Sequence, residues 1–209
     1  MIMNLRTLKI QNESKLLSEG IVVNPNLPII EELSEVSPRI ASDVASRICA
    51  MSYVVGLAFD AVPEHLIQNL KQYSLWGFVT EQEQELLLLE QIPKEEFNEL
   101  TWMPESIQAL VWSLGLIGMD HHMYCDDKLA SIVPPYCDPA GFIKNAELKP
   151  ITQIQEQCDL LYRLHWYSKH CRINGIECLY DESIISERRK ALDWVYGVTV
   201  NWDDIPMDT

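Results

Sequence analysis

The chain has 209 residues, a formal net charge of −15 and 47% hydrophobic residues, a composition typical of a globular protein and unlike that of a disordered or fibrous chain. A chain of this length forms one domain or at most two small ones. The acidic charge disfavours DNA, RNA and anionic lipid as partners, because each would be repelled over most of the surface. We therefore expect no nucleic-acid partner and no membrane partner.

The N-terminal residues and the cysteines bear on the cellular compartment. Residues 1–15 contain no apolar run of signal-peptide length. The most apolar stretch, residues 109–119, is much shorter than the roughly 20 residues that span a bilayer. None of the six cysteines stands at C-x-x-C spacing. We expect a cytoplasmic protein with reduced thiols, several of them buried.

Apolar residues recur at helical spacing along almost the whole chain, and no alternating strand pattern is convincing. The first helix predicted in this way covers residues 37–58, whose Ser-Pro start combines a capping residue with proline at the first helical position. A second helix is predicted over residues 63–73. Thr80 and Glu83 then form a capping-box motif that opens a third helix.

The central part of the chain predicts one short helix that starts at Pro93 and a separate helix over residues 104–118. The second of these has almost no polar face, which predicts that other helices surround it. It is the candidate central helix of the fold.

Two more helices are predicted towards the C-terminus. Thr152 opens a second capping-box motif, for a long helix that ends at the C-cap signal of Gly175. Asp181 or Ser183 caps the last helix, which ends near Gly197.

These elements predict an all-α, compact single-domain helical bundle over residues 1–209, built around the central apolar helix. The C-terminal tail, WDDIPMDT, is expected to fold back on the body, because Trp202 favours burial and the acids can pair with buried arginines. Trp194 faces away from the apolar arc of the last helix, which predicts packing against a loop, the tail or a partner. The oligomeric state is left open.

Residues 119–150 show little helical pattern apart from a turn near residues 140–146. Structureless loops longer than about 15 residues are uncommon in compact domains and often functional, although a plain surface excursion is an equal alternative. The histidines, cysteines and aspartates of this loop could bind zinc, but their spacing fits no zinc signature. We predict no metal site and no cofactor.

Two arginines fall inside the apolar arcs of their predicted helices, Arg47 in the first and Arg188 in the last. A buried guanidinium is costly unless a carboxylate pairs with it. Glu105 is a candidate partner in the first turn of the central helix, where the helix dipole also favours an anion, and Asp159 is another. The tail offers three more: Asp203, Asp204 and Asp208. Three interpretations of the two arginines are therefore open. They form structural ion pairs, their side chains snorkel to the edge of the helix, or they belong to a pocket for an anionic ligand.

The long helix carries a second column of side chains away from its apolar face: Asp159, Arg163, Trp166 and His170. An acid, a guanidinium, an indole and an imidazole in one row is a site-like selection, and Asp159 and Arg163 have the favourable acid-first order. The simpler interpretation is a solvated face with one ion pair. His165, in a neighbouring column, is a candidate general base, although a hydrogen-bonded packing histidine is commoner.

Two functional hypotheses remain, because the chain has no Gly-rich phosphate loop, no G-x-S-x-G and no H-E-x-x-H. The first is a non-catalytic binding or regulatory module that engages, and even neutralises, a basic protein. The alternative is an enzyme or small-ligand binder with a pocket for an anionic ligand. The candidate pocket residues are Arg47, Glu105, Asp159, Arg163, His165, Trp166, Arg188 and Asp203. Whether any reaction is catalysed stays open.

Several strings along most of the chain resemble one family. They are Arg47 in the early helix, a Trp-x-x-Glu (102–105) leading into ALVWSLG (109–115), DLLYRLHW (159–166), RKALDW (189–194) and the tail WDDIPMDT (202–209). In these strings the chain is similar to the domain-of-unknown-function family 4272. Met103 departs from the pattern, which has an arginine after the tryptophan in many members. The resemblance implies a compact, mainly helical fold and carries no established activity.

Overall fold

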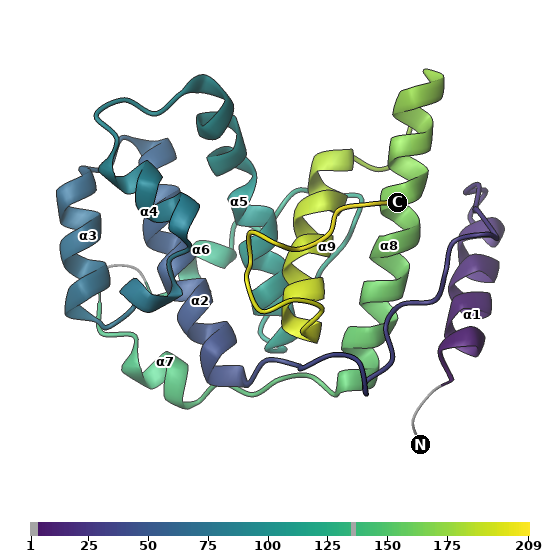
Figure 1. Cartoon of the computed structure of the whole chain (residues 1–209), viewed down its shortest axis with the longest axis horizontal. Helices are drawn as coiled ribbons and strands as arrows, with labels where there is room; N and C mark the ends of the chain where they lie inside the picture. Colours follow the sequence, from purple (N-terminus) through teal and green to yellow (C-terminus); the bar gives the residue numbers. More distant parts are fainter. Residues whose placement is uncertain (1–3, 135–136) are drawn as a thin grey trace.

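The computed structural model describes residues 4–134 and 137–209, and in this part every regular element is helical (Figure 1). The predicted all-α fold is thereby confirmed. The elements are α1 (Leu5–Ser18), α2 (Ala41–Val54), the 3₁₀ turn η1 (Val55–Phe59), α3 (Pro63–Gln72), η2 (Trp76–Phe78), α4 (Glu81–Leu88), α5 (Lys94–Ser113), α6 (Leu129–Ile132), α7 (Ala140–Lys144), α8 (Ile151–Asn174) and α9 (Glu182–Tyr196).

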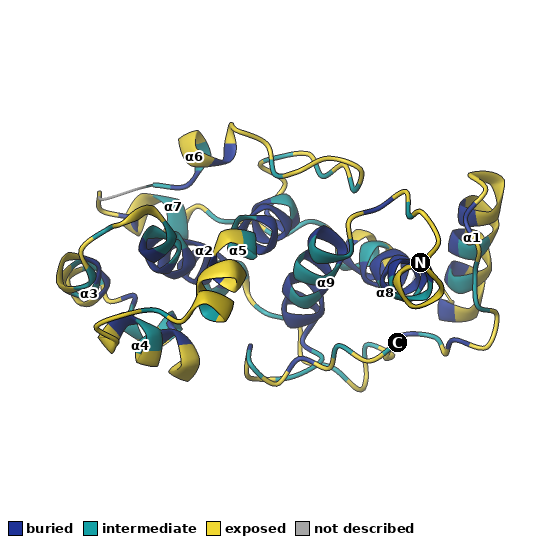
Figure 2. Ribbon diagram, turned by 90° about the horizontal axis from the view of Figure 1, so that it is seen from above, coloured by how far each residue is buried: buried dark blue, intermediate teal, exposed yellow. Residues whose placement is uncertain are grey.

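The helices form a row. Seen from above, α2, α5, α9, α8 and α1 follow one another across the molecule, with α3 and α4 beyond α2 (Figure 2). The contacts between helices give the same order, and those of α9 with α5 and with α8 are the most extensive. The last helix is therefore inserted between two earlier ones, and it shares the centre of the fold with α5.

The helix α5 is longer than the sequence predicts. The two helices expected from Pro93 and over residues 104–118 form one continuous element that passes through Pro104. Proline cannot donate a backbone hydrogen bond inside a helix. Packing on both sides of it supports the continuity, since Leu100 is buried and so is every residue from Glu105 to Val111.

The start of α2 also differs from the prediction. The helix begins at Ala41, so the Ser-Pro pair at residue 37 is not its cap. Instead, the backbone N–H groups of Ser37 and Arg39 donate to the carbonyls of Gly197 and Val195, at 3.2 and 2.9 Å. The segment before α2 is thus held in extended form along the end of α9.

Other predicted helix ends can be compared directly. The capping box of Thr80 and Glu83 is formed at α4, and Asp181 caps α9 through the N–H of Ser183. The capping box predicted at Thr152 is wrong, because α8 already begins after Pro150 and has no side-chain cap.

Two groups of buried apolar side chains make up the core. One lies among α1, α5, α8 and α9, and the other joins the second half of α2 to α3, η2, α4 and the first half of α5. The helix α2 contributes Val44 and Ile48 to the first group and Cys49 and Val54 to the second. This helix therefore connects the two halves of the row.

The tail folds back on the body as predicted. Trp202 and Ile205 are buried, and the Trp202 ring meets the Trp194 ring edge to face at 5.6 Å. Of the three neighbours expected for Trp194, a loop, the tail or a partner, the structure shows the tail. The Arg39 guanidinium donates to the Thr199 carbonyl at 2.6 Å and to the Val200 carbonyl at 2.5 Å, which holds the start of the tail.

Two further predictions concern the irregular segment of residues 119–150 and the reduced state of the cysteines. Residues 119–150 contain two short helices, and the predicted turn corresponds to α7; residues 135–136 lie outside the described part. All six cysteines are free, and Cys49, Cys158 and Cys171 are buried. Among the described residues, no helix combines the length and apolar character needed to cross a membrane.

The backbone at Gly197 leaves no room for a Cβ atom. Its φ is +87°, and a Cβ there would lie 2.0 Å from the Ser37 carbonyl oxygen. We expect Gly197→Ala to lower the free energy of unfolding by about 3 kcal/mol, measured by urea denaturation. Gly175→Ala is the matched control, because Gly175 has φ +63° but open space around it, and should cost about 1 kcal/mol. Equal losses in the two variants would contradict the close contact with Ser37.

Candidate functional site

Four arginines are buried in the structure, each at most 4% exposed: Arg47, Arg163, Arg188 and Arg189. The burial of Arg47 and Arg188 agrees with their positions in the predicted apolar arcs. Arg189 is absent from the sequence-based candidates. Each guanidinium contacts a carboxylate, as expected for a charge removed from water.

Arg188 pairs with Glu105, which the sequence proposed as its partner. The Nε and Nη2 atoms of Arg188 donate to Glu105 Oε2 at 3.0 and 2.7 Å. Its other donors bind the backbone carbonyls of Asp120 at 2.6 Å and Met123 at 2.9 Å. Glu105 Oε1 accepts from the N–H of Cys125 at 2.7 Å. This pair thus joins α9 to α5 and fixes the start of the long loop.

Arg163 and Asp159 are buried where α1 covers α8. Arg163 Nε donates to Asp159 Oδ2 at 3.0 Å, and Arg163 Nη1 lies 3.1 Å from Glu13. Asn12 donates to the same Asp159 oxygen at 2.8 Å. The solvated face expected here is wrong, because α1, a helix that the sequence pattern did not predict, covers it. The pair lies within α8, binds α1 through Asn12 and Glu13, and leaves its charges inaccessible.

The rest of that column lies at the surface. The rings of Trp166 and His170 stack at 4.9 Å with 17° between their planes, and both residues are partly exposed. The predicted column therefore divides into a buried ion pair and a half-exposed aromatic pair.

His165 is bound to Arg189 and to no other predicted site residue. Arg189 Nη1 donates to His165 Nδ1 at 2.7 Å, Nε donates to Asp193 Oδ2 at 3.1 Å, and the remaining bonds go to the tail carbonyls of Pro206 and Asp208. Burial and the positive charge of Arg189 lower the pKa of His165 to about 3. With its Nδ1 lone pair occupied and its pKa low, the imidazole is unsuited to act as a general base near neutral pH.

The pKa of the Asp193 carboxyl group is raised, whereas that of His165 is lowered. Burial raises its pKa to about 7, although Arg189 opposes the shift. Asp208, proposed from the sequence as a partner of Arg47 or Arg188, lies beside Arg189 instead, with 3.9 Å between Oδ1 and Nη2. The i,i+4 spacing of Arg189 and Asp193 was the signal that could have identified this cluster.

Arg47 is neutralised by Glu83, and not by a tail aspartate. Its Nη1 and Nη2 donate to the two oxygens of Glu83 at 2.6 and 2.7 Å, and Nη1 also donates to the Phe78 carbonyl at 2.8 Å. The capping box explains the choice of partner, because Glu83 Oε2 is held by the N–H of Thr80 at 3.0 Å. The guanidinium lies 4.4 Å from the centre of the Trp202 ring.

A groove of about 470 Å³ opens above this pair, between the η2–α4 segment and the tail. Arg47, Trp194 and Trp202 line it, together with four acidic residues: Glu81, Glu85, Asp203 and Asp204. We call it the acidic groove. Two of the predicted pocket residues, Arg47 and Asp203, line this groove together.

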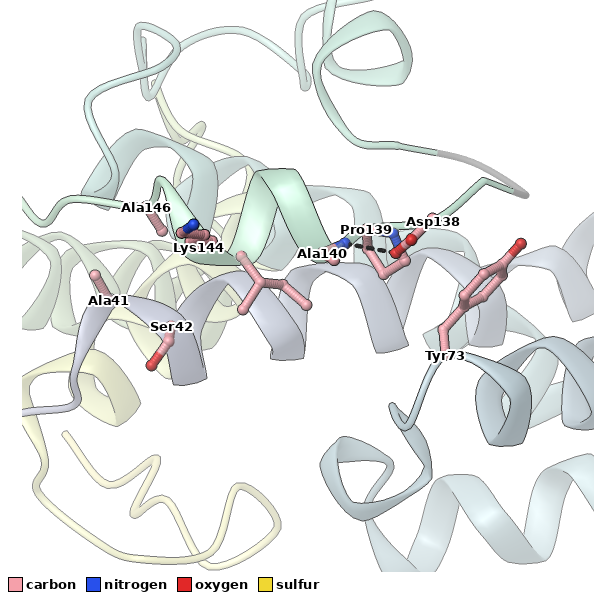
Figure 3. Close-up of a pocket in the computed structure, with 9 residues that line it drawn as sticks. Ala41, Ser42, Tyr73, Asp138, Pro139, Ala140, Lys144 and Ala146 are labelled. Carbon is pink, nitrogen blue, oxygen red and sulfur yellow. Dashed lines mark hydrogen bonds between the residues drawn. The ribbon is translucent and has the colours of Figure 1, made fainter.

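A second hollow, of about 570 Å³, lies where α7 packs on the start of α2 (Figure 3). Ala41 and Ser42 line it from α2, Asp138 and Lys144 from the α7 segment, and Tyr73 from the end of α3. The Asp138 carboxylate is occupied by the N–H of Ala140 at 2.9 Å. The hollow is wide and lined mostly by small side chains, and none of the predicted site residues reaches it.

The histidines of the long loop do not gather around a metal position. His121 is bound to Gln157 at 3.0 Å, and His122 stacks on Tyr180 at 4.3 Å. In the part of the chain that the structure describes, no three His, Cys, Asp or Glu residues are arranged to hold a metal ion.

The eight predicted pocket residues therefore occupy separate places. Arg47 and Asp203 share the acidic groove, and Glu105 with Arg188 holds the loop to α5 and α9. Three more lie on α8 in different contacts: Asp159 and Arg163 face α1, whereas His165 faces Arg189. Trp166 is at the surface. The geometry favours the structural interpretation of the arginines.

Removal of one partner of the Arg188–Glu105 pair should leave a buried charge uncompensated. We expect Arg188→Leu to lower the free energy of unfolding by about 3–5 kcal/mol in urea denaturation. The control Arg172→Leu breaks an exposed pair with Glu182 and should leave the unfolding midpoint near that of the wild type. A fully stable Arg188→Leu protein would mean that this guanidinium is free for a ligand.

The low pKa of His165 makes folding sensitive to acid. In the unfolded chain a histidine binds a proton near pH 6.5, whereas folded His165 stays neutral to about pH 3. Its contribution to stability is therefore present above pH 6.5 and is lost as the pH falls towards 3. We expect His165→Gln to lose less stability than the wild type between pH 7.5 and 5, measured by urea denaturation.

The comparison of the two proteins cancels the opposite contribution of Asp193, whose raised pKa favours the folded state as the pH falls below about 7. An identical pH dependence in both proteins would show that His165 binds its proton at the same pH in the folded protein as in the unfolded chain.

Comparison with known proteins gives one match. No curated protein and no solved structure is significantly similar to the chain. Residues 7–205 match the family described as "Domain of unknown function (DUF4272)". The match includes all four buried arginines and the lining of the acidic groove, and it confirms the family resemblance found in the sequence. The chain belongs to the DUF4272 family.

Proposed function

We propose that this protein is a non-catalytic binding module that recognises a basic segment of a partner protein in the acidic groove. The observation that carries the proposal is the imbalance of charge in the groove. Four carboxylates line it, whereas the charge of its lining arginine, Arg47, is matched by the buried carboxylate of Glu83. The groove therefore presents net negative charge to a ligand.

The state of the buried arginines supports a basic partner over an anionic one. Arg47 binds Glu83 through two hydrogen bonds, Arg188 binds Glu105 through two, and Arg163 and Arg189 are held by carboxylates on their own helices. An anionic ligand would have to displace an internal carboxylate from each of them. Such displacement would expose a buried charge pair and is costly.

The walls of the groove also suit lysine and arginine side chains. Cations are attracted to tryptophan rings, and those of Trp194 and Trp202 in the groove already hold the protein's own cations: Arg39 lies 4.7 Å from the Trp194 ring, and Arg47 and Lys190 lie 4.4 and 5.7 Å from the Trp202 ring. Val200, which is 79% exposed at its edge, can contact the aliphatic stem of a long basic side chain. The net charge of −15 would accelerate the approach of a basic partner.

We place this interaction in the cytoplasm. The three buried free thiols, Cys49, Cys158 and Cys171, suit a reducing compartment.

The proposal is tested with a fluorescent, unstructured lysine-rich peptide, whose binding is followed by anisotropy at low and moderate salt. The triple variant Glu85→Gln/Asp203→Asn/Asp204→Asn should bind about tenfold more weakly than the wild type, because three attractive charges are lost. Wild-type binding should also weaken steeply with added salt.

A matched control makes the same change in charge elsewhere. Glu64, Asp127 and Glu147 are exposed and do not line the groove, so Glu64→Gln/Asp127→Asn/Glu147→Gln should bind much as the wild type does. Equal weakening in the two triple variants would show that the peptide senses only net charge. That result, or undetectable binding by the wild type, would overturn the proposal.

A further inference from the structure

The connection between α8 and α9 runs back along the helix that it leaves. In Figure 1, α8 extends beyond the level at which α9 begins, so residues 175–181 return beside its last turns. Two contacts define this path. The N–H of Ile176 donates to the Cys171 carbonyl at 2.9 Å, and the Tyr180 ring meets the Tyr167 ring edge to face at 6.3 Å. The segment between these contacts therefore lies against the face of α8 that carries Tyr167 and, one turn later, Cys171.

This path brings two free thiols together. Cys178 stands between the two contacts and is partly buried against the apolar core that contains Cys171. The Cys178 thiol is hydrogen-bonded to the Cys171 thiol, and the Tyr167 hydroxyl is hydrogen-bonded to Cys171 as well. The same hydroxyl accepts from the N–H of Leu179, the residue after Cys178. The backbone and side-chain contacts thus agree in placing Cys178 beside Cys171.

The two thiols differ in their access to solvent. Cys171 is 1% exposed, whereas Cys178 is partly exposed, so a small disulfide can reach Cys178 first. Burial raises the pKa of the Cys178 thiol, although the N–H of Tyr180 opposes the shift. Because the thiolate is the form that attacks a disulfide, oxidation should be slow near neutral pH and faster in alkaline solution.

We propose that Cys171 and Cys178 are a site of reversible oxidation, at which a small disulfide such as glutathione disulfide converts the two thiols into an intramolecular disulfide. The Cys178 thiolate attacks one sulfur of the oxidant, which releases one glutathione thiolate and leaves a mixed disulfide on Cys178. Cys171 then loses its proton to water, attacks Cys178 Sγ and releases the second glutathione thiolate. The oxidant's disulfide bond is thereby broken and a new one is formed, so the two cysteines are oxidised and two molecules of glutathione are the reduced products.

The disulfide would tie the α8–α9 connection to the end of α8. The connection ends at Asp181, which caps α9, and α9 fills the space between α5 and α8. A cross-link here therefore strengthens the attachment of the central helix to its neighbour. In a reducing compartment such a bond forms transiently, as is usual for redox-sensing cysteines. Neither cysteine lines the acidic groove, so this proposal does not depend on the proposed function.

The test uses the full chain in buffers with varied ratios of glutathione to glutathione disulfide at about pH 8, where more of the Cys178 thiol is ionised. Thiols that remain free are alkylated, and mass spectrometry of proteolytic peptides locates any disulfide. We expect the Cys171–Cys178 disulfide to form first and dithiothreitol to reverse it. The oxidised protein should melt about 5 °C higher than the reduced protein, because the cross-link restricts the unfolded chain.

Two serine variants assign the effect to this pair. Cys178→Ser removes the accessible thiol, so Cys171 should stay reduced and the melting temperature should be the same in the oxidising and reducing buffers. Cys125→Ser is the matched control, because Cys125 is also partly buried. It should oxidise and melt as the wild type does.

Any of four results would overturn the proposal. The two thiols stay free in glutathione disulfide, or the mixed disulfide on Cys178 is not resolved by Cys171. Alternatively, a disulfide joins other cysteines, such as Cys49 and Cys137, in place of this pair. The fourth is a rise in the melting temperature of Cys178→Ser on oxidation equal to that of the wild type.

Discussion

Water hydrates a guanidinium so strongly that its removal from water must be compensated, and this constraint shapes most of the structure. For Arg47 and Arg188 the compensating carboxylate comes wholly from another helix. Arg47 on α2 meets Glu83 on α4, and Arg188 on α9 meets Glu105 on α5. Each of these pairs also binds backbone groups of a loop. The ion pairs therefore determine which helices are neighbours and where the connecting segments run, whereas the apolar side chains supply most of the favourable burial.

The same pairs determine what the surface can do. Four of the sixteen basic residues are buried, and so are four of the acidic residues, so the remainder of the protein keeps the whole net charge of −15. The acidic groove lies directly above one of the pairs, where the tail and α4 bring their acids together. A hollow lined by His121 and Gln157 lies beside another pair, since His121 contacts both Gln157 and Arg188. Structural ion pairs and surface hollows are thus adjacent in this fold.

Much of the helical architecture could be predicted from the sequence, because helix periodicity and caps depend on residues close together in the chain. The burial of Arg47 and Arg188 followed from the same local geometry. The partner of Arg188, Glu105, was also proposed from the sequence, whereas Glu83, the partner of Arg47, lies in a distant segment that only the tertiary fold brings to α2. The helix α1 was missed for a related reason. Asn12 interrupts its stripe of Leu5, Leu8 and Leu16, and its buried amide is bound by Asp159 and the Glu156 carbonyl of α8. That contact also explains why Arg163 is not at a solvated face. The candidate site was accordingly predicted less well than the fold.

The insertion of α9 between α5 and α8 has a consequence for synthesis. A ribosome makes the chain from its N-terminus, so α5 and α8 leave the ribosome before the helix that fills the space between them. Until then Glu105 has no Arg188, and Arg47 lacks the cover of Trp202. The nascent protein therefore carries exposed apolar faces until residues 182–205 emerge, and a chaperone that shields these faces would act on this protein late in translation.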